Sequence, residues 1–169
     1  MSHPLEARIA AEVALESGKP VWVSWSLRDI APCSIPRDDA CASTSADEPG
    51  MVTLRSGHSI QEAFDMMPEG VAAVLFNCCQ PESITAGLPE LVALARGRMS
   101  ADLRVGAYAN SFCIDSHAFH LKNQTGITKR DDLGPERCVQ LALLWVLSVG
   151  LMSAIAYSPQ RPCFILHLR

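Results

Sequence analysis

Two adjacent cysteines, Cys78 and Cys79, stand where the sequence predicts that a buried strand gives way to a helix. The uncharged apolar run Val71–Phe76 is typical of a strand in a parallel sheet, and Pro81-Glu82 suits the first turn of a helix. Loops at the carboxyl ends of parallel strands surround the pockets of α/β proteins, and a thiol there can serve as a metal ligand or a nucleophile. The alternative is that both small thiols fill the core. A vicinal pair is a poor clamp for one ion, so we expect at most one of the two to bind metal.

A second group of metal-binding residue types, Cys113, His117 and His120, lies in a predicted loop. These side chains suit zinc, but their spacing matches no strong zinc-finger pattern and a second cysteine is missing. We therefore assign no metal to this group.

The elements that would position these side chains alternate along the chain. Apolar runs predict strands at residues 21–27, 71–76, 103–109 and 151–156. Periodicity and capping signals predict helices at residues 5–17, from the Ser59–Glu62 capping box to Pro68, at 81–98 with an interruption near Gly87 and Pro89, and at 134–149. Long loops are expected at residues 30–50 and 110–132. Such alternation implies an α/β fold of about four parallel strands with right-handed crossover helices, which is half of an eight-stranded barrel.

The first predicted helix has apolar residues at helical spacing. Leu5, Ile9, Val13 and Glu16 stand at helical spacing, whereas Glu6, Arg8 and Glu12 are available to solvent. Gly18 is expected to end this helix in the left-handed conformation.

Composition excludes several classes of protein. The chain has 169 residues, 49% of them hydrophobic, which suits one domain and excludes a disordered chain. The net charge is −4 and no basic run is present, so nucleic-acid binding has no electrostatic support. The seven cysteines form no compact disulfide framework, and the sequence from Met1 has no signal-peptide pattern. A reducing, cytoplasmic setting is therefore expected.

The uncharged stretch at residues 138–160 is long enough to span a bilayer. The division favoured here is instead a buried helix, a turn at Gly150 and a buried strand. A membrane association is therefore the less favoured alternative.

Five stretches of this chain resemble the homocysteine S-methyltransferase family. They are Pro20–Ser24, Leu54–Gly57, Leu75–Glu82, Val105–Asn110 and Asp132–Glu136, the last leading to Trp145. Their order and spacing are similar to those in the second half of that family's barrel, over about residues 4–150. The resemblance implies half of a TIM-type (β/α)8 barrel domain at residues 1–150, followed by a divergent tail at 151–169.

The resemblance also implies a reaction and a site. In the family, three cysteine thiolates hold a catalytic zinc that binds the thiol of homocysteine. That sulfur attacks the methyl group of a sulfonium donor, such as S-methylmethionine or S-adenosylmethionine, and methionine is formed. By the resemblance Cys78 is a zinc ligand and Cys79 its non-ligand neighbour. Four further residues would line the substrate pocket or hold the ligand loop, although each could equally be a structural polar group: Ser24, Asn77, Tyr108 and Asn110.

Two features depart from the family's pattern. The family's other two thiolates come from a Gly-Gly-Cys-Cys element, but here Gly150 is followed by Leu151-Met-Ser-Ala and the next cysteine is Cys163. The family's first half has no counterpart either. We therefore expect a truncated enzyme that is inactive as it stands. The alternative is a non-catalytic half-barrel that serves as an interaction or regulatory fragment, with unpaired strand edges that favour self-association.

Overall fold

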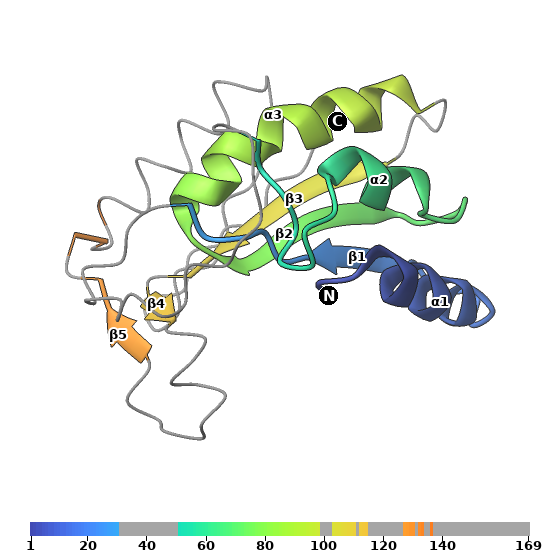
Figure 1. Cartoon of the computed structure of the whole chain (residues 1–169). Helices are drawn as coiled ribbons and strands as arrows, with labels where there is room; N and C mark the ends of the chain where they lie inside the picture. The colour runs from blue at the N-terminus through green and yellow to red at the C-terminus, as the bar shows by residue number, and fades with distance from the viewer. Residues whose placement is uncertain are drawn as a thin grey trace.

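The structure, a computed structural model, describes residues 1–30, 51–98, 103–110, 112–114, 127–130, 132–133 and 136. Three parallel strands in these ranges form one open sheet in the order β1 (Trp22–Trp25), β2 (Ala73–Cys79), β3 (Arg104–Ala109). Three helices accompany the sheet: α1 (Pro4–Leu15), α2 (Ile60–Asp65) and α3 (Pro81–Gly97) (Figure 1). A separate antiparallel pair is formed by β4 (Phe112–Ile114) and β5 (Ile127–Lys129).

The predicted order and direction of the first three strands are confirmed. Ser24 of β1 lies opposite Leu75 of β2, and Asn77 of β2 lies opposite Tyr108 of β3, both in parallel register. The sheet confirms the α/β class and is consistent with part of a barrel. The fourth expected strand (151–156), the tail (151–169), the loop at 31–50 and all of the helix expected at 134–149 except the helical Glu136 lie outside the described residues.

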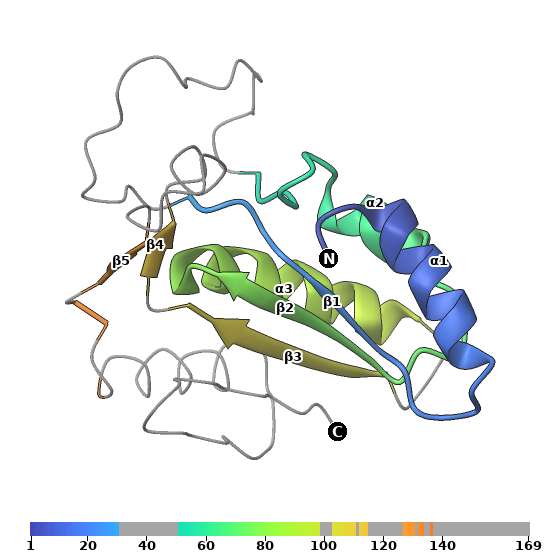
Figure 2. The ribbon, with the colours of Figure 1, turned by 90° about the horizontal axis from the view of Figure 1, so that it is seen from below.

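One face of the sheet forms the hydrophobic core with α3. Successive side chains of a strand point to opposite faces, and the alternate residues Val74 and Phe76 of β2 are fully buried. They join the core cluster together with Ile84, Leu88 and Leu91 of α3. Figures 1 and 2 show α3 lying along this face, with α1 beside the β1 edge. The opposite face carries the alternate residues, which include three of the four predicted substrate-binding positions.

Helix α1 is oriented differently from what its apolar spacing suggests. Leu5, Ile9 and Val13 are 46%, 54% and 62% exposed, whereas Ala7 and Ala11 are buried. The small alanine side chains let the helix approach β1 and α2 closely, and nothing else in the described ranges covers its outer face. Gly18 adopts the left-handed conformation as expected, with φ of 68°.

Helix α3 runs through the interruption that the sequence predicts. Pro89 lies inside the helix, although proline removes one helical hydrogen bond. Gly87 permits close packing, because a Cβ there would lie 3.0 Å from Ile60 and 3.1 Å from Leu27. Burial of the apolar face of α3 against the sheet outweighs the local cost of these two residues.

Two further expectations change. The loop expected at residues 110–132 contains β4 and β5, in which Cys113 pairs with Thr128. His117 and His120 lie outside the described residues. None of the helices in the described part of the chain has the length and hydrophobicity that a bilayer span requires, and residues 138–160 lie beyond that part.

Candidate functional site

The two adjacent thiols lie at the carboxyl end of β2, as expected, but within the strand and not in a loop. Strand β2 continues to Cys79, and its pairing with β3 shifts register between Asn77 and Cys79. Cys78 sits at this shift with φ of 54°, in the left-handed region that non-glycine residues rarely adopt. The shift is a bulge, in which one extra residue stands without a partner in register. It leaves the Cys78 thiol exposed and the Cys79 thiol buried.

Cys79 behaves as a core residue. It is fully buried and lies opposite Ala109 of β3. Burial raises the pKa of its thiol to about 12, because the charged thiolate is poorly solvated there. Since the thiolate is the form that binds metals and attacks electrophiles, Cys79 is held in its unreactive form.

The polar residues predicted around the thiols gather on the sheet face opposite α3. Asn77 and Tyr108 are paired in register and half-buried. Asn77 connects β1 to the exposed thiol: its Nδ2 donates to Cys78 Sγ at 3.4 Å, and its Oδ1 accepts from Ser26 Oγ at 3.4 Å. Ser26 was not predicted, although its place at the carboxyl end of β1 follows the same rule that singled out Asn77.

The other two predicted residues lie at the margins of this group. Asn110 follows β3, and its backbone N–H donates to the carbonyl of Cys79 at 2.9 Å. Ser24 lies in β1, two residues before Ser26 and so farther from the carboxyl edge of the sheet. Its Oγ is buried and has no hydrogen-bond partner among the described residues. The structure therefore brings Asn77 and Cys78 into direct contact and places Ser24 deeper in the sheet.

Arg55 and Asp29 complete the surroundings of Cys78. Arg55 Nη2 donates to the carbonyl of Cys78 at 3.0 Å and pairs with the Asp29 carboxylate at 3.4 Å. Arg55 Nε donates to the carbonyl of Leu27 at 3.3 Å. The other oxygen of Asp29 accepts from the backbone N–H of Gln80, at the start of α3, at 3.0 Å. Arg55 lies in one of the stretches that carry the family resemblance, but nothing in its spacing indicates this contact.

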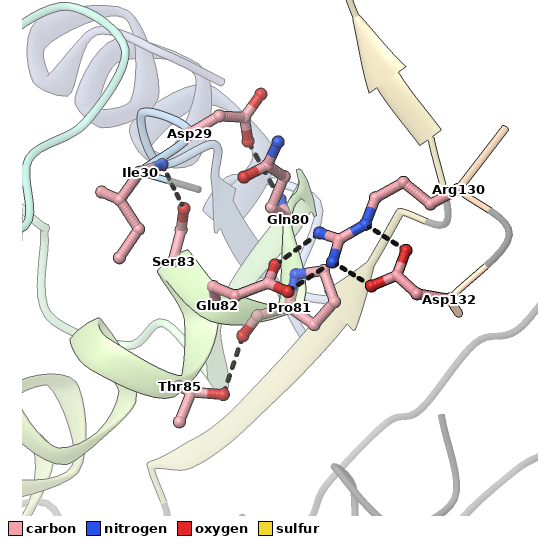
Figure 3. Close-up of polar contacts among 9 residues, drawn as sticks. All are labelled: Asp29, Ile30, Gln80, Pro81, Glu82, Ser83, Thr85, Arg130 and Asp132. Atoms are coloured by element: carbon pink, nitrogen blue, oxygen red, sulfur yellow. Dashed lines mark hydrogen bonds and ion pairs between the residues drawn. The ribbon is translucent and has the colours of Figure 1, made fainter. Parts of the chain in front are cut away.

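The first turn of α3 is held by a second ionic cluster, shown in Figure 3. Arg130 donates through both terminal nitrogens to Glu82, each at 2.7 Å, and it also donates to Asp132 at 2.6 and 3.0 Å. Its pKa is raised by the hydrogen bonds to Asp132 and Glu82, which favour the charged guanidinium. On the other side of the turn, Ser83 Oγ accepts from the N–H of Ile30 at 3.2 Å.

A catalytic zinc site has three protein ligands as a rule. Among the residues that the structure describes, no three His, Cys, Asp or Glu side chains lie together so that they could hold a metal. Cys78 suits one ligand position, since its thiol is exposed at the carboxyl edge of the sheet. The described residues do not complete a zinc centre.

Comparison with known protein families agrees with the resemblance seen in the motifs. Residues 1–152 match the family model described as homocysteine S-methyltransferase. Searches of curated proteins and of solved structures found no significant match.

Proposed function

The chain belongs to the homocysteine S-methyltransferase family, and we propose that the carboxyl edge of its sheet contributes one side of a site for methyl transfer to homocysteine. The observation that carries this proposal is the Cys78 thiol. It is the one of the two vicinal thiols that is exposed, and it lies at the strand end where α/β proteins bind their ligands.

In this proposal Cys78 would supply one thiolate to a zinc ion, and it is the only cysteine of the sequence that the resemblance places at a ligand position. Bound zinc would stabilise the thiolate of homocysteine at neutral pH. Asn77 orients the Cys78 sulfur through its amide N–H. Tyr108 lines the same face of the sheet, with Ser24 and Asn110 at its margins.

The reaction itself is a displacement at carbon. A bond forms between the homocysteine sulfur and the methyl carbon of a sulfonium donor, while the bond from that carbon to the donor sulfur breaks. The donor leaves as a neutral thioether, and methionine is the product. One ligand does not hold a catalytic metal, so we expect the chain alone to bind zinc weakly and to show no turnover.

Zinc competition against a chromogenic chelator tests the role of Cys78. Cys78→Ser should lower the affinity of the chain for zinc, whereas the matched variant Cys79→Ala should retain it, because the Cys79 thiol is buried and neutral. Equal effects of the two substitutions would refute the assignment. A methyl-transfer assay with homocysteine and each sulfonium donor, run on the same variants, tests the expected lack of turnover.

A second candidate function, a non-catalytic fragment that associates with another copy of itself, is supported by the outer side of α1. Leu5, Ile9 and Val13 form an exposed apolar stripe there. Sedimentation of the chain at increasing concentration tests this candidate. Ile9→Glu should abolish association, and Ala14→Glu, which places the same charge at an exposed position off the stripe, should not. A monomer at all concentrations would exclude it.

A further inference from the structure

We propose that Arg55 selects which of the two adjacent thiols is presented at the site. The proposal rests on the proposed function of Cys78 as a metal ligand, and it makes Arg55 a positioning residue that acts through the backbone of Cys78.

The alternation of β2 would by itself present the other thiol. Val74 and Phe76 face the core, so the next residue of that parity, Cys78, would also face the core in a regular strand. Cys79 would then lie on the same face as Asn77 and Leu75. A shift of one residue exchanges the two faces of a strand. The bulge at Cys78 makes this exchange, and Cys79 takes the core position opposite Ala109.

The bulge is a strained conformation that its neighbours must hold. Cys78 is the only described residue other than glycine with a positive φ. Such a conformation persists where surrounding contacts fix it. The guanidinium of Arg55 binds the carbonyl of Cys78, which lies in the peptide group that follows the strained residue. It binds the carbonyl of Leu27 at the same time and so fastens this peptide group to the segment after β1.

Arg55 is itself rigidly placed. Its backbone N–H donates to the carbonyl of Ser26 at 3.0 Å. The turn that carries it closes through two bonds: Leu54 N–H donates to His58 at 2.8 Å, and Gly57 N–H donates to Leu54 at 2.9 Å. Gly57 has φ of 87°, which suits glycine.

A lysine would not replace this arginine. The planar guanidinium presents several donors in a fixed fork and reaches the carbonyls of Leu27 and Cys78 together with the Asp29 carboxylate. An ammonium group is a single point of positive charge and cannot span these acceptors in the same way.

The test is alkylation of the native full chain with iodoacetamide, with fragment ions in mass spectrometry separating Cys78 from Cys79. In the unaltered chain Cys78 should be labelled much faster than Cys79. In Arg55→Ala and Arg55→Lys the labelling should move from Cys78 to Cys79, because the bulge is released. Added methylguanidinium should restore labelling of Cys78 in Arg55→Ala but not in Arg55→Lys. Arg8→Ala, which removes an exposed arginine whose ion pair with Glu12 lies within α1, is the matched control and should change neither rate.

The readout separates positioning from other effects. A role in general stability alone would raise the labelling rate of the buried Cys79 without slowing that of the exposed Cys78, and that result would overturn the proposal. An unchanged ratio of Cys78 to Cys79 labelling in folded Arg55→Lys would overturn it as well. Because labelling requires neither zinc nor a methyl donor, the exchange of thiols can hold even where the zinc and methyl-transfer assays refute the proposed function.

Discussion

Replacement of Arg130 by methionine should destabilise the chain measurably, because it removes the cation that joins the first turn of α3 to the segment after β5. The Arg130 side chain is 15% exposed and lies between Glu82 on the first turn of α3 and Asp132 beyond β5. Methionine keeps much of the apolar stem, so the change removes the charge and its hydrogen bonds while largely preserving the packing.

The magnitude follows from the geometry of the two pairs. Arg130 and Glu82 form a bidentate pair with both distances at 2.7 Å, and a hydrogen bond to a charged group contributes about 1.5–3 kcal/mol. Glu82 is 36% exposed and regains water when its partner is lost, which lowers the net cost. Asp132 is 64% exposed, so its pair contributes about 0–1 kcal/mol. We expect Arg130→Met to lower the free energy of unfolding by about 2 kcal/mol.

Urea denaturation of the single and double variants measures this directly. A double-mutant cycle between Arg130→Met and Glu82→Gln should give a coupling energy of about 1–2 kcal/mol, and the cycle with Asp132→Asn should give less than about 1 kcal/mol. A coupling energy to Asp132 larger than that to Glu82 would refute the reasoning, since it would mean that the more buried ion pair is not the stronger one.

Three further predictions concern single residues. Because the pKa of Cys79 is raised to about 12, about one Cys79 thiol in 10⁴ is ionised at about pH 8. Alkylation of the folded chain should therefore modify Cys78 and spare Cys79. Rapid labelling of Cys79 in the folded chain would contradict its burial. Hydrogen bonds from the Ser59 backbone N–H and hydroxyl lower the pKa of Glu62 in the folded chain. The ionised Glu62 carboxylate therefore stabilises the fold above pH 4.5, the ordinary pKa of glutamate, and this stabilisation is lost as the pH falls through the lower pKa of the folded chain. Glu62→Gln should flatten the stability curve in that acidic range, and an unaltered curve would argue against the capping box. Gly87→Ala should lower the thermal stability of the chain, because overpacking costs about 1–3 kcal/mol whereas the gain in helix propensity is about 1 kcal/mol. Gly97→Ala is the control and should not destabilise the chain, because a Cβ at Gly97 would have no other atom within 4 Å.

The elements of the central sheet could be predicted from local patterns. Apolar runs placed all three described strands of the sheet, and the alternation with helices set their parallel order. The capping box at Ser59 and Glu62 is present in both of its halves, since each residue bonds to the backbone of the other. These features depend on residues within a few positions of one another, so the sequence alone carries them.

The orientation of α1 and the continuity of α3 depended on neighbours. In α1 two sets of residues recur at helical spacing, one with large apolar side chains and one with Ala7 and Ala11. The alanines are the buried set, because their small side chains let the helix pack closer to its neighbours. In α3 the burial of one face outweighs Pro89, which acts locally to interrupt a helix. Periodicity in the sequence identifies a helix, but it does not show which of two apolar faces is buried or how strongly packing against the sheet stabilises the helix.

The sequence alone placed a thiol pair at the carboxyl edge of the sheet, and the family resemblance favoured Cys78 as the ligand, but only the tertiary structure shows how that thiol becomes the exposed one. Regular alternation assigns Cys78 to the core, and a bulge of one residue reverses the assignment. The contacts on the Cys78 backbone come from Arg55, 23 positions earlier in the chain, and Arg55 is in turn paired with Asp29, 26 positions before it. Hydrogen bonds between residues so far apart leave no period or motif in the sequence, because they exist only once the strands and the turn before α2 have been brought together.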